Sequence, residues 1–508
     1  MTRLPKNNYL IPYSPWYSKL GKNEMYYPSL GEIKTLTSVG NLAPVYREIN
    51  ADLETPVSAY LKVARPPYSF LLESVEGGER LARYSFIGTE PSEVIKTGPG
   101  CPQGMVDPLA LVEESLARFH PVPVEGLPPF HGGTVGYLSY DAVHYFEPRV
   151  PLSKTDYLGV PEALFLLTDS ILVFDHLRHK IQVVSHVRLD GDVENAYDMA
   201  VQRIEILVER LKKPLPFAEP YEKPLTHGQS NLELTSNFTA AEYQAMVQRC
   251  KEYIVAGDII QVVPSQRLAR PTLARPLDIY RALRVLNPSP YMYFLNLDDF
   301  QIIGASPELL VRVENGLVLN FPLAGTRPRG STPEEDEKMA RILRADTKEQ
   351  AEHIMLVDLG RNDVGRVSLP GSVQVTDLMR VVRYSHVMHL ESEIQGQLRP
   401  DRTIYDALRS CLPAGTLSGA PKIRAMEIIA ELEQQKRGPY GGAVGYFSFE
   451  GNMDTAITIR TIVLKDGVAY VQAGGGVVYD SDPESEYQET LQKAQALLRA
   501  ISEAESGS

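Results

Sequence analysis

The stretch ALFLLTDSILVFDHLRHKIQVVSHVRL (Ala163–Leu189) contains short apolar runs, at 163–176 and 180–189, with turn-forming residues between them. Short apolar runs bounded by turn residues are typical of β-strands. LARYSFIG (Leu81–Gly88) has the same character. We therefore expect a strand-rich region from about residue 40 to residue 211, after an irregular start that mixes turn formers and aromatic residues.

The second half of the chain mixes helices with strands. Thr239 and Glu242 form a T-x-x-E capping box, and apolar residues then recur at helical spacing as far as Gly257. Cys250 lies on this apolar stripe, which predicts a buried and unreactive thiol. DTAITIRTIVLKDG (Asp454–Gly467) has the composition of a strand. Because helices and strands do not alternate regularly, the pattern favours an α+β fold over a doubly wound sheet.

A segment rich in Pro and polar residues, KKPLPFAEPYEKPLTHGQSN (Lys212–Asn231), lies between the two regions. This composition is typical of a linker. The predicted division is an N-terminal domain at 40–211, a linker at 212–236 and a C-terminal domain at 237–508.

One short repeat spans this boundary. GGTVGYLSYD (Gly132–Asp141) resembles GGAVGYFSFE (Gly441–Glu450), which predicts a similar strand in each half of the molecule. A single match of this length is weak support for pseudo-symmetric sheets.

The composition excludes several classes of protein. The 508 residues include 51 Lys and Arg against 64 Asp and Glu, a net charge of −13 with no basic block, which argues against nucleic-acid or anionic-membrane partners. The three cysteines form no C-x-x-C pair, which argues against zinc, iron–sulfur and disulfide sites and suits a reducing cytoplasm. No apolar run is long enough for a membrane helix, and the first twenty residues lack the apolar core of a signal peptide.

Glycines and carboxylates that could carry chemistry lie in the C-terminal half. The run AGGG (Ala473–Gly476) follows a predicted strand and precedes a helix that starts near Pro483. Its N–H groups could approach an anion, although a tight turn is the simpler interpretation. The spacing matches no nucleotide-binding loop.

Two predicted helices each carry a pair of glutamates on one face. Glu349 and Glu352 are spaced i, i+3, and so are Glu486 and Glu489. A solvated helix face is the simpler interpretation. The alternative is that each helix presents a carboxylate to a hard cation, and Mg²⁺ suits one or two protein carboxylates.

Arginine and histidine offer further candidates. Arg460 lies among apolar residues of a predicted strand, where it is either structurally paired or bound to a ligand carboxylate. His386 and His389 lie on a predicted strand or turn, and a structural role is the more common one for such residues.

Together these segments resemble the chorismate-utilising enzymes, from about residue 237 to the C-terminus. The similar motifs are PLAGTRPRG (322–330), AEHIMLVDLGRNDVGR (351–366), VMHLESE (387–393), PAGTLSGAPK (413–422), GPYGGAVGY (438–446) and AGGGVVYDSDPESEYQE (473–489). With LLES (71–74) and NPSPYMYF (287–294), the chain is most similar to the anthranilate synthase component I branch. The resemblance implies a two-domain α+β fold with large antiparallel sheets in a β-sandwich, surrounded by helices, whose N- and C-terminal segments can interleave.

Two positions distinguish the reactions within this family. Aminodeoxychorismate synthases typically carry a nucleophilic Lys where this chain has Ala324. Isochorismate and salicylate synthases use a Lys base where this chain has Gln261, which cannot act as a base. Both positions point to ammonia as the nucleophile. The implied enzyme is a Mg²⁺-dependent lyase that converts chorismate and ammonia into anthranilate and pyruvate, the first committed step of tryptophan biosynthesis.

The resemblance also implies roles for individual residues. Glu352 and Glu489 resemble the Mg²⁺ ligands, and Glu308, His389 and Thr416 resemble groups that assist departure of the ring hydroxyl, with the acid and base roles of Glu308 and His389 left open. The implied substrate contacts are Gly325, Thr326, Tyr440, Arg460, Gly474, Gly475 and Gly476. Gly475 stands where relatives often have Ala, a mild departure.

A partner subunit and a regulator are implied as well. Cys101 lacks the surroundings of a glutaminase nucleophile, so a separate glutamine amidotransferase subunit is expected to supply ammonia. Glu73, Ser74, Pro290, Tyr291 and Met292 resemble a tryptophan feedback site, and interface packing is the alternative. An enzyme that stops at the aminated intermediate and a silent paralogue remain as rival functions.

Overall fold

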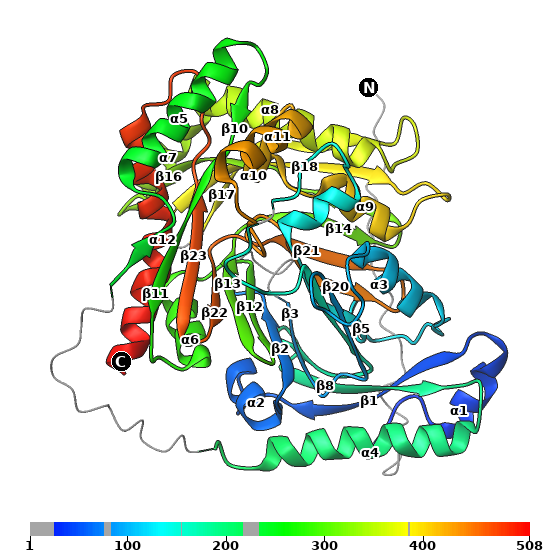
Figure 1. The fold of residues 1–508 in the computed structure, drawn as a ribbon. Coiled ribbons are helices and arrows are strands. Elements are labelled where there is room, and N and C mark those ends of the chain that lie inside the picture. Colours follow the sequence, from blue (N-terminus) through cyan, green and yellow to red (C-terminus); the bar gives the residue numbers. More distant parts are fainter. Residues whose placement is uncertain (1–24, 76–82, 154, 217–232, 385–386, 508) are drawn as a thin grey trace.

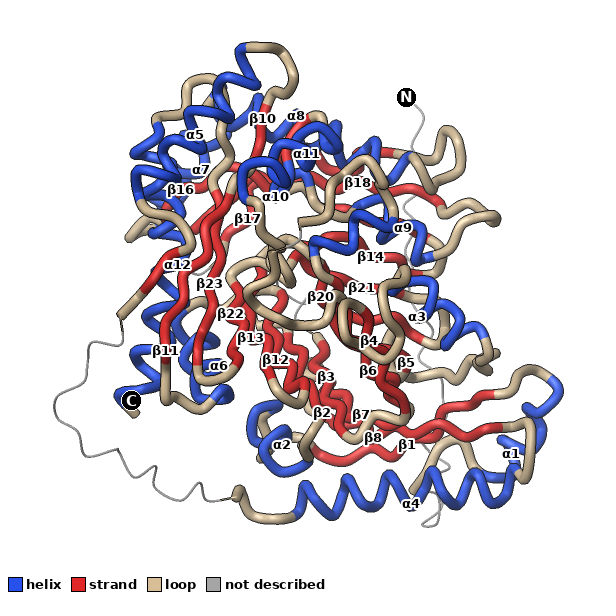
Figure 2. The backbone as a smooth tube through the Cα atoms, viewed as in Figure 1, coloured by secondary structure: helices blue, strands red, loops and turns tan. Residues whose placement is uncertain are grey.

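The computed structural model describes residues 25–75, 83–153, 155–216, 233–384 and 387–507. Two large antiparallel sheets dominate it (Figures 1 and 2). The first sheet has eleven strands in the order β1 (Leu42–Asn50), β8 (Lys180–Arg188), β7 (Ser170–Asp175), β3 (Tyr84–Thr89), β2 (Tyr68–Glu73), β12 (Tyr291–Leu297), β13 (Phe300–Ser306), β22 (Thr461–Lys465), β23 (Val468–Gly474), β11 (Ser265–Pro271) and β9 (Thr235–Ser236).

The second sheet has ten strands, of which nine form one row and the tenth, β17, lies alongside. Its order is β16 (Leu323–Pro328), β18 (Val387–Gln397), β15 (Leu317–Asn320), β14 (Leu309–Glu314), β21 (Met453–Ile457), β20 (Ala443–Ser448), β5 (Gly133–Leu138), β6 (Ala163–Thr168) and β4 (Glu93–Thr97), and β17 (Gln374–Arg383) pairs with β18. A separate two-stranded ribbon joins β10 (Gln261–Val262) to β19 (Gly419–Ala420).

Helices surround the sheets. They are α1 (Leu30–Thr35), η2 (Leu36–Ser38), α2 (Pro56–Val63), α3 (Pro108–Ala117), η3 (Tyr140–Tyr145), α4 (Val193–Lys212), α5 (Ala240–Val255), α6 (Pro276–Leu286), α7 (Pro333–Ala345), α8 (Thr347–Gly365), α9 (Ile404–Cys411), α10 (Gly415–Ser418), α11 (Lys422–Glu433) and α12 (Pro483–Ser506). In Figure 1, α4 runs along β1 and β8.

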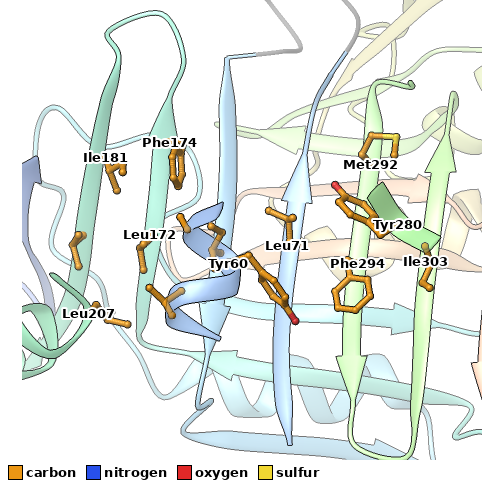
Figure 3. Packing of buried hydrophobic residues seen from close by; sticks show 14 of the residues in the cluster. Tyr60, Leu71, Leu172, Phe174, Ile181, Leu207, Tyr280, Met292, Phe294 and Ile303 are labelled. Carbon is orange, nitrogen blue, oxygen red and sulfur yellow. The ribbon is translucent and has the colours of Figure 1, made fainter. Parts of the chain in front are cut away.

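The hydrophobic core forms layers. One cluster, which includes Phe70, Tyr137 and Tyr293, draws residues from both sheets and lies between them. A second cluster packs the outer face of the first sheet against α2, α4, α6 and α12, as the side chains of Tyr60, Tyr280 and Phe294 in Figure 3 illustrate. Alternate residues of β12 therefore face opposite layers, as the pleat of a strand requires. The α+β sandwich expected from the sequence is confirmed.

Both sheets cross the predicted domain boundary. Each combines strands from before residue 212 with strands from after residue 236, and β2 pairs with β12 in the register Leu71↔Phe294. The division into domains at 40–211 and 237–508 stays a prediction, but neither part builds a sheet alone. Residues 217–232 of the linker lie outside the described residues.

The short repeat forms neighbouring strands. β5 and β20 pair antiparallel, and Gly136 lies opposite Gly445, its equivalent in the repeat. A local two-fold axis therefore passes between these two glycines. A Cβ at Gly136 would lie 2.0 Å from the Leu164 carbonyl oxygen, and one at Gly445 would lie 2.1 Å from that of Asp454, so the close packing requires glycine at both positions.

One predicted strand is broken. Residues 454–467 do not form a single strand, because β21 ends at Ile457 in the second sheet and β22 begins at Thr461 in the first. Arg460 lies in the crossing with a left-handed backbone (φ +48°). The prediction that Arg460 lies within a strand is therefore wrong, since apolar residues flank a sharp turn that carries no Gly or Pro.

Candidate active site

The chain crosses between the two sheets at two adjacent places. Residues between β13 and β14 make the first crossing and include Glu308, and residues between β21 and β22 make the second and include Arg460. The crossings are joined by backbone hydrogen bonds, from Ile457 to the Glu308 carbonyl (3.0 Å) and from Ala305 to the Arg460 carbonyl (3.1 Å). Two oppositely charged side chains are thereby held close together.

Glu308 lies in a poorly solvated position. Burial raises the pKa of its carboxyl, while a hydrogen bond from Thr416 and the charges of Arg460 and Lys493 oppose that rise. The Thr416 hydroxyl donates to Glu308 Oε2 over 3.1 Å. A carboxyl with a raised pKa holds a proton closer to neutral pH, so it suits general acid catalysis.

His389 lies on β18 in a fixed orientation. Its Nδ1 donates to the Gly325 carbonyl oxygen over 2.7 Å, because that oxygen can only accept, and the Thr326 hydroxyl lies 3.1 Å from the same nitrogen. Burial lowers the pKa of His389 to about 4. The ring is therefore neutral at pH 7, and its buried Nε2 has a lone pair with no partner among the described residues.

A bulge in β16 makes this contact possible. The pairing of β16 with β18 shifts register between Ala324 and Arg327. Gly325 adopts a left-handed backbone there (φ +67°), which glycine tolerates best. The bulge turns the Gly325 carbonyl towards His389.

The Arg460 guanidinium has no partner among the described residues. No hydrogen bond or ion pair is formed by its side chain within the described part of the chain, and burial lowers its pKa while the charge of Glu308 opposes this. A partly buried cation without a counter-ion is costly unless a ligand anion compensates it. Arg460 therefore suits binding of a carboxylate.

The glycine run passes beside Tyr440. A Cβ on Gly474 would lie 3.0 Å from the Tyr440 hydroxyl, and the Gly474 carbonyl accepts from Lys493 Nζ over 2.8 Å. The Gly475 N–H donates to the Pro264 carbonyl over 3.3 Å, so this donor is already used. The run does link a strand to a helix as predicted, since β23 ends at Gly474 and α12 begins at Pro483.

Carboxylates on α8 and α12 form a candidate donor set for a hard cation. Burial and then the neighbouring Glu352 raise the pKa of Glu349, and burial chiefly raises that of Glu486, with Glu489 adding to it. Glu486 Oε2 is buried without a hydrogen-bond partner among the described residues. Lys348 and Lys493 offset part of this negative charge.

The donor set fits Mg²⁺ better than a metal held entirely by protein. No three ligand-type side chains of the described residues converge on one point. Mg²⁺ commonly takes one or two carboxylates and completes its shell with water and substrate oxygens. Gln261 Nε2 donates to Glu352 Oε1 over 3.2 Å and orients one candidate ligand, and Lys493 lies 2.8 Å from Glu489.

Comparison with known proteins identifies the family. The sequence model described as chorismate binding enzyme matches residues 68–499. The chain belongs to the chorismate-utilising enzyme family. It is 50% identical to anthranilate synthase component 1 of Acetivibrio thermocellus over 94% of this chain and 99% of that protein. It is also 50% identical to the Pseudomonas putida protein of the same name, over 93% and 98% of the two chains.

Solved structures agree with this assignment. Anthranilate synthase component I from Streptococcus pneumoniae TIGR4 has a TM-score of 0.73 and 40% identity, covering 88% of this chain and 98% of that one. The menaquinone-specific isochorismate synthase of Escherichia coli, at 19% identity and a TM-score of 0.67 over 93% and 98% of the two chains, shares the fold. The predicted resemblance to the anthranilate synthase component I branch is confirmed.

The candidate feedback residues surround a cavity of about 480 Å³ between the two sheets. All five residues named from the sequence line it: Glu73, Ser74, Pro290, Tyr291 and Met292. The Glu73 carboxylate is already engaged by Arg284 (3.1 and 3.2 Å) and by the Tyr280 hydroxyl, which ties β2 to α6.

Sequence reasoning missed the polar wall of this cavity. Arg312 pairs with Asp454 (2.7 Å), and the Tyr291 hydroxyl donates to the same carboxylate (3.1 Å). The available signal was a charge inside an apolar strand, since Arg312 lies between Val311 and Val313 of β14 and points the opposite way.

His386 lies outside the described residues. No described helix is both long and apolar enough to cross a membrane.

Proposed function

We propose that this chain is the chorismate-aminating subunit of an anthranilate synthase, which converts chorismate and ammonia into anthranilate, pyruvate and water. The names of the relatives at 50% identity support this reaction. The single observation that carries it is the amide at Gln261. This position holds no base to activate water, and its amide is hydrogen-bonded to Glu352. Ala324 likewise offers no nucleophile, whereas ammonia attacks without prior deprotonation.

The first step forms a C–N bond at C2 of the ring while the C4 hydroxyl leaves. Glu308 donates the proton that turns the departing hydroxide into water, because its raised pKa keeps it protonated more readily than an exposed carboxyl. Thr416 holds the Glu308 carboxyl in place over 3.1 Å.

The second step removes the C2 proton and breaks the C–O bond to the enolpyruvyl group, which leaves as the enolate of pyruvate and takes up one proton to become pyruvate. His389 Nε2 is suited to accept this proton, since the ring is neutral and Nδ1 is held by Gly325. A chain that lacked this acceptor would stop at the aminated intermediate. The free lone pair therefore favours the complete reaction over that rival.

Substrate binding follows from charge complementarity. Arg460 and Tyr440 hold the enolpyruvyl carboxylate beside the glycine run at 474–476, and Gly325 and Thr326 contact the ring side. Glu352 and Glu489 would hold Mg²⁺. The bound cation would neutralise the ring carboxylate and orient it.

The proposal includes a partner and a regulator. A glutamine amidotransferase subunit supplies ammonia, as the name "component 1" of the relatives suggests. Tryptophan occupies the 480 Å³ cavity, and the Asp454 carboxylate forms part of the wall beside it. Bound tryptophan favours a conformation that binds chorismate poorly. Location in the cytoplasm stays a prediction.

The test is anthranilate fluorescence from purified chain, chorismate, MgCl₂ and an ammonium salt at alkaline pH. We expect a signal that EDTA abolishes and tryptophan reduces. Glu352→Gln should abolish it, whereas Asp358→Asn, an exposed position on the same helix, should not. Chorismate consumed without fluorescence would favour the stalled aminated intermediate. Chorismate left intact, also with the amidotransferase added, would favour a silent paralogue.

A further inference from the structure

A fully buried ion pair lies behind the candidate active site. Glu433, the last residue of α11, and Arg437 have side chains that are 4% and 1% exposed and 2.6 Å apart. The contact is bidentate, because Arg437 Nε also donates to the second carboxylate oxygen over 2.9 Å. Burial alone would lower the pKa of Arg437, and the Glu433 carboxylate more than reverses this.

The remaining donors of Arg437 bind two carbonyl groups from separate segments. Nη1 donates to Leu417 O and Nη2 to Val263 O, each over 2.7 Å. These carbonyls lie at one end of the ribbon formed by β10 and β19, where Val263 also donates to Ser418 O over 3.0 Å. The guanidinium therefore clamps together the two segments that flank the ribbon, at Val263 and Leu417.

Each clamped segment carries a residue of the candidate site. Thr416, which precedes Leu417, donates to Glu308, and Gln261, at the start of β10, donates to Glu352. On one side the ribbon thus positions the proposed acid, and on the other it positions a proposed metal ligand.

Further contacts of the pair reach the substrate-binding residues. Glu433 Oε1 accepts from the backbone N–H and the hydroxyl of Ser265 over 2.8 and 2.9 Å, and Ser265 is paired with Gly474. The Arg437 guanidinium lies 5.6 Å from the centre of the Tyr440 ring. One ion pair therefore contacts the neighbours of Thr416, Gln261 and Gly474 and lies close to Tyr440.

Stability alone does not explain such a pair. Desolvation of two buried charges offsets much of their attraction, and apolar pairs of similar size are often equally stable. Planar guanidinium geometry does provide several hydrogen bonds in fixed directions.

We propose that Glu433 and Arg437 are positioning residues that fix the 261–265 and 415–418 segments relative to each other for the aminating reaction. The catalytic part of this proposal rests on the function proposed above. The structural part, the immobilisation of the two segments, does not.

The test replaces both residues together, in Glu433→Met/Arg437→Met, so that no charge is left unpaired. We expect a chain that folds with a thermal midpoint near that of the unmodified protein. Its kcat for anthranilate should fall about 100-fold, as for a misplaced catalytic group, with a much smaller change in KM for chorismate. Amide hydrogen exchange should lose protection at 261–266 and 415–418.

A neighbouring ion pair is the matched control. Lys436 and Glu162 are also buried, at 8% and 3% exposed and 2.9 Å apart, but contact none of the candidate site residues. Glu162→Met/Lys436→Met should leave kcat and the exchange of both segments unchanged. If the two double variants lose kcat and protection equally, or if neither does, the positioning role is refuted.

Two further outcomes are separable. If the double variant does not fold, the same measurements are made on Arg437→Lys. Lysine keeps the charge but cannot form all four hydrogen bonds of Arg437. Unchanged kcat and unchanged hydrogen exchange in this variant would overturn the proposal. If the unmodified chain makes no anthranilate, the proposed function fails, and hydrogen exchange at the two segments still decides whether the pair immobilises them.

Discussion

Arg460→Gln tests whether the unpaired guanidinium at the sheet crossing binds a substrate carboxylate. Arg460 has a left-handed backbone (φ +48°). Glutamine, like arginine, is unbranched at Cβ, so the substitution does not change how well the side chain fits this backbone. It removes the charge and the planar pair of N–H donors. We expect a large loss of kcat/KM for chorismate together with a small gain in stability.

The magnitude of the activity loss follows from the hydrogen bonds involved. Two hydrogen bonds from a charged donor contribute about 1.5–3 kcal/mol each, and a glutamine amide keeps one neutral bond of about 0.5–1.5 kcal/mol. A net loss of about 2.5–4.5 kcal/mol corresponds to a decrease of about 70- to 2,000-fold in kcat/KM.

The same substitution is expected to lower activity but raise stability, and the rise has a physical cause. Burial lowers the pKa of Arg460, which means that the folded protein disfavours its charged form relative to the unfolded chain. Removing that charge relieves the cost, and a single stabilising substitution commonly adds about 0.5–2 kcal/mol.

Steady-state kinetics with saturating ammonia and thermal denaturation measure both effects on one sample. The control is Arg409→Gln on α9, because Arg409 is paired with Asp107 (2.9 Å) and Asp406 (3.3 Å) away from the site. This control should lose stability and keep kcat/KM. If Arg460→Gln keeps kcat/KM, or loses it in step with a lower thermal midpoint, Arg460 does not bind substrate as proposed.

Three other substitutions test separate parts of the site. Thr416→Val removes the hydrogen bond that holds the Glu308 carboxyl, worth about 0.5–1.5 kcal/mol when the acting carboxyl is protonated. It should lower kcat by up to about tenfold. Because the bond lowers the pKa of Glu308, its loss should also move the alkaline limb of the kcat/KM profile to higher pH, and an unmoved limb would exclude Glu308 as the acid. Gly474→Ala should impair both stability and activity, because its Cβ would lie 2.6 Å from the Pro264 carbonyl oxygen. Gly475→Ala should be tolerated, because its Cβ comes that close only to the movable end of the Glu486 side chain. Equal effects of the two substitutions in melting and activity measurements would contradict this. Asp454→Asn breaks the ion pair with Arg312 at the cavity wall. It should weaken inhibition by tryptophan about tenfold or more in a dose–response assay and leave kcat unchanged. Unchanged inhibition would show that tryptophan binds elsewhere.

The strands of the fold were predictable wherever a segment is apolar on both faces. Residues 163–189 form β6, β7 and β8, because each strand lies between the sandwich core and another buried layer. Their partners were not predictable in the same way. The pairing of β2 with β12 joins Leu71 to Phe294, and nothing local in either segment encodes a contact at such a separation.

Site residues divide along the same line. The candidate feedback residues could be named from motifs and do line one cavity. Arg312 and the pair of Glu433 and Arg437 were missed, because their importance depends on burial and on contacts with carbonyl groups far away in sequence. A motif shows which residue type occupies a position. Only the folded structure shows which distant groups that residue binds.

The position of the site follows from the architecture of the sandwich itself. Inside either sheet, backbone groups are paired in the ladder and side chains pack in apolar layers, so a charged residue there must find a partner. At the two crossings the chain leaves one ladder and enters the other, and Glu308 and Arg460 are held side by side by backbone hydrogen bonds between the crossings. Each charge shifts the pKa of the other towards its charged form, yet no ion pair joins the two side chains. A carboxylate substrate with a hydroxyl leaving group can therefore use both, the cation for binding and the acid for protonation, and a pair already closed on itself could do neither.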